Sequence, residues 1–149
     1  MAENKVTLHR VLSAAPEKVF RAFSSGSAYA SWIPPYGFIC EVEHFEFKKD
    51  GTFKMSFLNF STNKKHSFGG SIVELQQNEF IKYVERFDDP ALPGKMTTSV
   101  SIRKVSAGTE INIVQENIPE AIPADMCYLG WQDSLDKLKR LVEPHIPEA

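Results

Sequence analysis

Hydrophobic and polar positions alternate over much of the chain, a pattern typical of strands that bury one face. The first alternating segment, Lys5 to Leu12, predicts a strand that stops at Ser13-Ala14-Ala15-Pro16. Between Cys40 and Asn117 five or six further strands fit, separated by turn residues at the spacing of an antiparallel meander. Their predicted ranges are 39–48, 52–60, 65–75, 79–87, 96–105 and 109–117.

Two short helices are predicted between the first strand and the meander. Pro16 suits the first turn of a helix, which we expect to end near Ser24. Gly26 is expected to provide a left-handed stop, and Ser27 to cap a second helix over residues 28–33. Pro34-Pro35 must end that helix.

Helical spacing returns at the end of the chain. A helix of about five turns is expected to begin at Pro123 or Asp125 and to end at Pro144. Its predicted buried face, at spacings of 3 and 4, is Tyr128, Trp131, Leu135, Leu138 and Val142. A strongly curved antiparallel sheet wrapped around this helix hides the most apolar surface, so the predicted class is α+β.

Length and composition predict that residues 1–149 form one domain. The chain has 42% hydrophobic residues and no repeat or low-complexity stretch. A net charge of -2 offers no basic field, so nucleic acid is not an expected partner. No apolar run approaches membrane-spanning length and the start lacks a secretory signal, so we expect no membrane association and a cytoplasmic location.

The polar residues do not predict a metal or cofactor site. Cys40 and Cys127 are 87 positions apart and the four histidines are scattered, without metal-ligand spacing. Nucleophile-elbow, phosphate-loop and dinucleotide motifs are missing from the sequence. Gly69-Gly70 lies within a predicted strand, which indicates a bulge or a close approach of two backbones.

Four short stretches resemble one known family in order and spacing. They are AAPEKVFRAF at 14–23, WIPPYGF at 32–38, FEFKKDGTF at 45–53 and GWQDSLDKL at 130–138. The chain therefore resembles the activator-of-Hsp90-ATPase homologue 1-like family, a branch of the START-like, Bet v 1-like helix-grip superfamily. It departs from the usual Arg-x-Gly-Gly hairpin at Lys49-Asp50-Gly51, where we expect Gly51 to adopt a positive φ.

The resemblance implies a fold and several functions. The helix-grip fold has a seven-stranded antiparallel sheet, two small helices, and a long helix that closes a cavity. Superfamily members bind lipids, hormones or polyketides, and some catalyse cyclisation or hydrolysis. The co-chaperone that names the family has an additional N-terminal domain for which 149 residues leave no room, so direct ATPase activation is not expected.

Polar residues on the inward face are the candidates for chemistry. Glu85 lies between Tyr83 and Phe87 on that face, where burial would raise its pKa and make it an acid, a base or a ligand anchor. The alternative is a structural pair with an Arg or a Tyr. Gln115 could orient a ligand or satisfy backbone groups at the end of the sheet, and His44 and Asn59 are weaker candidates of the same kind.

Apolar side chains on the same face could line a pocket or simply fill the core. The predicted ligand-binding set is Trp32, Met55, Phe57, Phe68, Tyr83, Glu85, Val100, Ile113, Gln115, Trp131 and Leu135. The segment from Asp88 to Lys95, with its prolines and glycine, could be a lid or a homodimer contact.

The sequence is consistent with three functions. The leading hypothesis is a non-enzymatic binding protein whose cavity accepts a small hydrophobic molecule, anchored by Glu85 and Gln115. An interaction module related to Hsp90 activation would instead have a filled core and a functional outer surface. A cyclase- or hydrolase-type enzyme would use Glu85 as its general acid or base, the one catalytic residue that we predict.

Overall fold

The computed structural model describes residues 4–148. Within this range the chain forms seven strands and three helices. In chain order they are β1 (Val6–Leu12), α1 (Pro16–Ser24), α2 (Gly26–Trp32), β2 (Phe38–Phe45), β3 (Thr52–Asn59), β4 (Lys64–Gln76), β5 (Phe80–Phe87), β6 (Met96–Val105), β7 (Gly108–Glu116) and α3 (Ala124–Val142). The predicted element order is confirmed, and no bound shifts by more than three residues.

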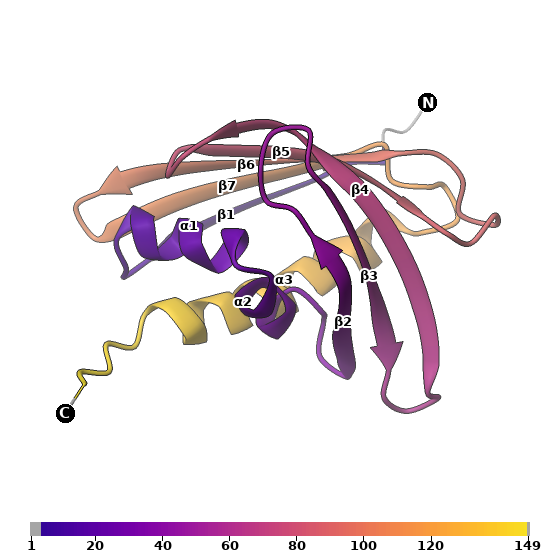
Figure 1. Cartoon of the computed structure of the whole chain (residues 1–149), viewed down its shortest axis with the longest axis horizontal. Coiled ribbons are helices and arrows are strands. Elements are labelled where there is room, and N and C mark those ends of the chain that lie inside the picture. Colours follow the sequence, from indigo (N-terminus) through magenta and orange to yellow (C-terminus); the bar gives the residue numbers. More distant parts are fainter. Residues whose placement is uncertain (1–3, 149) are drawn as a thin grey trace.

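The seven strands make one antiparallel sheet in the order β1-β7-β6-β5-β4-β3-β2. Figure 1 shows this sheet arching over α3, with α1 and α2 on the same concave side. β1 therefore lies next to the last strand although it comes first in the chain. This arrangement confirms the predicted α+β helix-grip fold.

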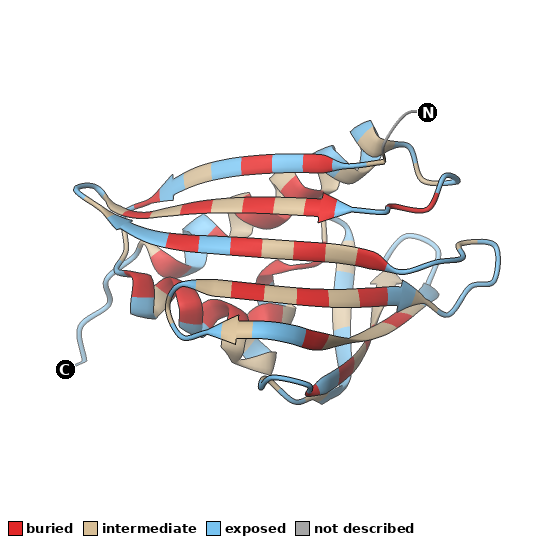
Figure 2. Ribbon diagram, turned by 90° about the horizontal axis from the view of Figure 1, so that it is seen from above, coloured by how far each residue is buried: buried red, intermediate tan, exposed pale blue. Residues whose placement is uncertain are grey.

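Alternation along the strands separates an inner face from an outer face. On β6 the inner positions Met96, Thr98, Val100 and Ile102 are buried, while the residues between them are less so. Figure 2 shows the same alternation, with buried bands separated by intermediate and exposed ones along neighbouring strands. The buried bands face α3 because a pleated strand sends successive side chains to opposite sides.

The long helix buries a slightly different stripe from the one predicted. Trp131, Leu135, Leu138 and Val142 are buried as expected, together with Ser134. Tyr128 was expected to be buried as well, but it is 38% exposed. The inward position one turn before Trp131 is Cys127, and Tyr128 lies about 100° further round the helix.

Two local predictions about glycine are wrong. Gly26 does not stop a helix; it is the first residue of α2, and Ser25 caps that helix by accepting a hydrogen bond from the Ala28 backbone N–H at 3.4 Å. In the β2–β3 hairpin the left-handed residue is Asp50, with φ 64°. Gly51 is needed there for space, since a Cβ at that position would lie 2.2 Å from the Glu46 carbonyl oxygen.

The pair Gly69-Gly70 marks a close approach of two backbones. A Cβ on Gly70 would lie 1.9 Å from the Val84 carbonyl oxygen and 2.8 Å from the Glu85 Cα. The register shift in β4 comes later, between Ile72 and Glu74. Gly70 therefore allows β4 to pass closely beside the part of β5 that carries Glu85.

Candidate functional site

A pocket of about 250 Å³ lies between the sheet and the N-terminal half of α3. Its walls come from five strands, the end of α2, the segment before α3, and α3 itself. The lining residues are Tyr29, Ile33, Pro35, Phe57, Phe68, Tyr83, Glu85, Phe87, Met96, Gln115, Ile122, Met126, Cys127, Gly130, Trp131 and Ser134. Met126 is 62% exposed, so the pocket reaches the protein surface beside it.

Aromatic rings fix one wall of the pocket. Phe57 and Phe68, on β3 and β4, pack edge to face with ring centroids 4.9 Å apart. Phe87 on β5 continues the row, 6.3 Å from Phe68. Edge-to-face contacts of this kind hold rings in defined orientations, so the wall is preformed.

Among residues 4–148, Glu85 is the only residue of the pocket lining that carries a carboxyl group. β5 places it on the same face as Tyr83 and Phe87, opposite Met96 on β6. It is 8% exposed, and burial alone raises the pKa of its carboxyl group to about 7. Neither a hydrogen bond nor a neighbouring cation from the described residues offsets that burial. Near neutral pH the group therefore exchanges a proton readily.

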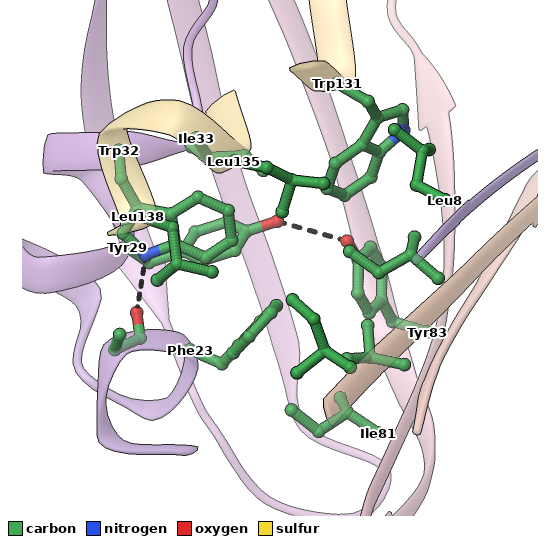
Figure 3. Close-up of a cluster of buried hydrophobic side chains, with 14 of the residues drawn as sticks. Leu8, Phe23, Tyr29, Trp32, Ile33, Ile81, Tyr83, Trp131, Leu135 and Leu138 are labelled. Carbon is green, nitrogen blue, oxygen red and sulfur yellow. Dashed lines mark hydrogen bonds between the residues drawn. The ribbon is translucent and has the colours of Figure 1, made fainter. Parts of the chain in front are cut away.

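Two tyrosines lie beside this carboxyl group. The hydroxyl groups of Tyr29 and Tyr83 point toward one another at 3.2 Å, as the dashed line in Figure 3 shows. Burial is the main cause that raises the pKa of both phenols, and the charge of Glu85 raises each further. Both side chains are therefore neutral hydrogen-bonding groups at any physiological pH.

Gln115 is the centre of a buried polar network. Its Nε2 donates to Thr98 Oγ1 at 3.1 Å, while its Oε1 accepts from Trp131 Nε1 and from Cys127 Sγ, both at 3.0 Å. These bonds link β6, β7 and α3 and fix the Trp131 ring. Burial raises the pKa of the Cys127 thiol to about 11, so this cysteine is not an activated nucleophile.

The structure brings six of the predicted ligand-binding residues together and leaves five elsewhere. Phe57, Phe68, Tyr83, Glu85, Gln115 and Trp131 line the pocket. Trp32, Met55, Val100, Ile113 and Leu135 are instead fully packed, each at most 2% exposed. The prediction that these five residues line the pocket is therefore wrong, because they belong to the packed core.

Close packing explains why these five side chains do not reach the pocket. Trp32 Nε1 donates to the Ala22 carbonyl oxygen at 2.9 Å, which turns the indole toward α1 (Figure 3). Val100 and Ile113 lie opposite one another in the register of β6 and β7, and neither is exposed. They fill the space beneath α3.

The two weaker polar candidates also lie away from the pocket. His44 is exposed on β2, and its Nε2 lies 3.1 Å from Thr52 Oγ1. Asn59 closes the turn between β3 and β4, where its Oδ1 accepts hydrogen bonds from the backbone N–H groups of Ser61 and Thr62. Both are ordinary surface features of the hairpins that carry them.

Several lining residues were missed by sequence reasoning. Phe87 and Met96 had a usable signal, because both share the inner face with Glu85. Cys127 and Gly130 lie on the same helical stripe as Trp131 and Ser134. Ile122, in the segment before α3, had no periodic signal that could place it.

No group of three or more His, Cys, Asp or Glu side chains is placed to hold a metal ion within residues 4–148. No helix of the described chain combines the length and hydrophobicity required to cross a lipid bilayer.

Several solved structures resemble this chain over most of its length. A crystal structure of a protein from Chromobacterium violaceum is 51% identical, with a TM-score of 0.94 over 95% of this chain and 99% of that chain. A solution structure from Staphylococcus epidermidis is 18% identical, with a TM-score of 0.80 over 100% and 98% of the two chains. A crystal structure of the AHSA1 protein from Silicibacter pomeroyi is 16% identical, with a TM-score of 0.78 over 91% and 95%. The last two show likeness of fold alone.

No match was found among curated proteins. The family model described as "Activator of Hsp90 ATPase homolog 1-like protein" matches residues 13–143, which include all four motifs noted in the sequence. The chain therefore belongs to the activator of Hsp90 ATPase homolog 1-like family.

Proposed function

We propose that this protein binds a small, mainly hydrophobic molecule in the pocket beneath α3, with Glu85 as its polar anchor. The observation that carries this proposal is a carboxyl group that is 8% exposed, lines an aromatic pocket and receives no compensating hydrogen bond. Removing most of the water around a carboxyl group costs free energy, and a ligand that supplies a hydrogen-bond donor recovers part of it.

The size of the pocket limits the ligand. A cavity of roughly 150 Å³ holds benzene, and drug-sized ligands occupy roughly 300–1,000 Å³. At about 250 Å³ the pocket suits a compound with one or two rings or a short branched chain. A long acyl chain would have to extend past Met126 into solvent.

Gln115 has a different role in this proposal from the one first expected. Its carbonyl oxygen already accepts two hydrogen bonds from α3, so it has little capacity left for a ligand. We assign it the task of holding Trp131 as a fixed wall. Glu85 then remains as the single polar anchor.

The test is native mass spectrometry of freshly purified protein beside two variants of Gly130. Gly130 lines the pocket, and a Cβ there would make only an ordinary 3.6 Å contact with Pro35. Gly130→Leu fills part of the pocket, whereas Gly130→Ala is the matched control. We expect extra mass that is lost on denaturation in the wild type and in Gly130→Ala, and its absence in Gly130→Leu.

Two outcomes would contradict the proposal. Retention of the extra mass by Gly130→Leu would place the molecule elsewhere on the protein. A bare mass for the wild type, together with no uptake of added naphthalene, would indicate that the pocket does not bind small molecules. In that case capture of purified Hsp90 becomes the decisive experiment, because the interaction-module hypothesis does not need the pocket.

Acid–base catalysis is a second candidate, favoured by one observation. A carboxyl group with a pKa near 7 that lines a pocket can both donate and accept a proton at neutral pH. If the protein is an enzyme, a molecule recovered from it will change mass on incubation with the wild type and not with folded Glu85→Gln. Unchanged mass with both proteins would leave binding as the function.

A further inference from the structure

We propose that the pocket selects organic cations, namely molecules with an ammonium group on a hydrophobic body of one or two rings. This inference rests on the proposed function and names the chemical class of its ligand. It follows from the inventory of hydrogen-bond donors, acceptors and charges around the pocket.

Most hydrogen-bond donors of the pocket wall are already used within the protein. Trp131 and Cys127 donate to Gln115, and the Ser134 hydroxyl donates to the Ile33 carbonyl oxygen at 2.5 Å. The hydroxyl groups of Tyr29 and Tyr83 share one hydrogen bond, which uses one of their two O–H donors. A ligand that needs donors, such as a carboxylate or a phosphate, therefore finds few of them.

The charged polar group of the wall is an acceptor. The carboxyl group of Glu85 lines the pocket and has no donor from the described residues. An ionised carboxylate forms its strongest hydrogen bonds with charged N–H donors. The ligand group that best completes the site is therefore a protonated amine.

The electrostatic character of the walls points the same way. The lining contains no Lys, Arg or His, so nothing in it attracts an anion. Phe57, Phe68, Phe87 and Trp131 are aromatic, and aromatic ring faces attract cations. An anionic ligand would meet both the negative charge of Glu85 and these rings.

Proton linkage follows from the same geometry. The titratable groups facing Glu85 are Tyr83 on its own strand, Tyr29 on α2 and Cys127 on α3, and all three are neutral at pH 7. Glu85 is thus the group that titrates in the empty pocket, with a pKa of about 7. A bound ammonium group favours the ionised carboxylate, so amine binding below pH 7 must release a proton and weaken as the pH falls.

Three probes of nearly equal size test the inference on the full chain: naphthylmethylamine, naphthylmethanol and naphthoate. Isothermal titration calorimetry at pH 8 should show the amine binding at least about tenfold more tightly than the alcohol or the acid. At pH 5.5 the amine affinity should fall by roughly tenfold, while the alcohol affinity should change little.

One variant tests whether Glu85 causes the preference for the amine. Glu85→Gln keeps the shape of the side chain and removes its charge, so it should bind the amine and the alcohol about equally while retaining its affinity for the alcohol. Circular dichroism checks that the variant is folded. If it is not, the probe and pH comparison in the wild type decides by itself.

The possible failures are distinguishable. Equal or tighter binding of the alcohol or the acid would overturn the cation inference and leave the proposed function intact. Binding of none of the three probes would contradict the proposed function, and the inference with it. An amine preference that persists in folded Glu85→Gln would show that the carboxyl group is not its origin.

Discussion

The two halves of α3 cover very different interiors. The C-terminal half buries Leu138 and Val142 at 0% and 1% exposure, against a dense core that includes Val19 of α1 and Leu12 of β1. The N-terminal half carries Met126, which is 62% exposed, and covers the 250 Å³ pocket. One amphipathic helix therefore closes a packed core at one end and a pocket at the other.

The difference comes from what accompanies the helix at each end. α1 lies beside the C-terminal half of α3 (Figure 1). Aliphatic side chains from α1, α3 and β1 therefore pack in one core there. At the other end large aromatic rings on β3, β4 and β5 pack against each other along the sheet. Rings held in this way cannot collapse into the remaining space. The packed core and the pocket for which we propose ligand binding thus lie at different ends of one interior.

The largest expected effect is a truncation on the packed half. Leu138→Ala should lower the free energy of unfolding by about 2–5 kcal/mol, because it opens a cavity at a fully buried site. Met126→Ala, on the same helix at the pocket end, should change it by less than about 0.5 kcal/mol. Urea unfolding of both variants measures the contrast, and equal losses would erase the distinction between the two halves.

The second largest expected effect is a pH dependence of the free energy of unfolding, caused by Glu85 in the pocket half. Its pKa is about 7 in the folded protein against an ordinary 4.5, so between these values the folded protein binds more protons than the unfolded chain. Stability from this group is fully present below pH 4.5 and is lost as the pH rises through 7. We expect Glu85→Gln to gain roughly 3 kcal/mol over the wild type between pH 4.5 and pH 8.

Urea unfolding of both proteins across this pH range measures that difference. Carboxylates whose pKa is lowered, such as Glu110 and Glu143, titrate in both proteins and cancel in the comparison. A constant difference between Glu85→Gln and the wild type would mean that the buried carboxyl group does not titrate in this window.

A smaller loss is expected in the pocket half, at Gln115. Gln115→Leu removes the acceptor of the Trp131 N–H and should cost about 1–3 kcal/mol, since that buried donor loses its partner. Gln77→Leu, in the exposed turn before β5, is the matched control and should lie within about 0.5 kcal/mol of the wild type. The Trp131 indole proton resonance should also shift in Gln115→Leu alone. An unshifted resonance would argue against the network.

The smallest effect is expected on the outer surface of the packed half. Lys139→Ala removes an exposed ion pair with Glu143 one turn away and should cost only about 0.3–0.5 kcal/mol. The Glu143 carboxylate keeps its hydrogen bond from the Ser13 backbone N–H. A loss comparable to that of Leu138→Ala would indicate that charges, and not buried apolar contacts, stabilise this end.

Most of the fold was predictable because period and turn chemistry act locally. The helix from Pro16 and the strand from Met96 were placed at their observed bounds for that reason. The failures at Gly26 and Gly51 have different causes. A Cβ at Gly26 would make only ordinary 3.4 Å contacts with Phe45, whereas Gly51 is required for space and not for a positive φ.

The candidate site was only partly predictable. Inward alternation correctly placed Glu85 beside Tyr83 and Phe87, because strand geometry fixes which residues share a face. The same rule could not separate Phe57, which lines the pocket, from Met55, which is packed. That distinction depends on how far the sheet curves away from α3, which is a property of the assembled layers and of no single segment.

The position of β1 has a consequence for how this protein forms during synthesis. Val6 pairs with Gln115, a partner that is 109 positions later in the chain, and β1 has no other neighbour in the sheet. At roughly 5–20 residues per second, a ribosome would take roughly 5–20 s to supply that partner. The first strand to emerge is therefore the last to be paired, and closing so long a loop slows folding. Throughout that interval the backbone N–H and C=O groups of β1 lack their sheet partners.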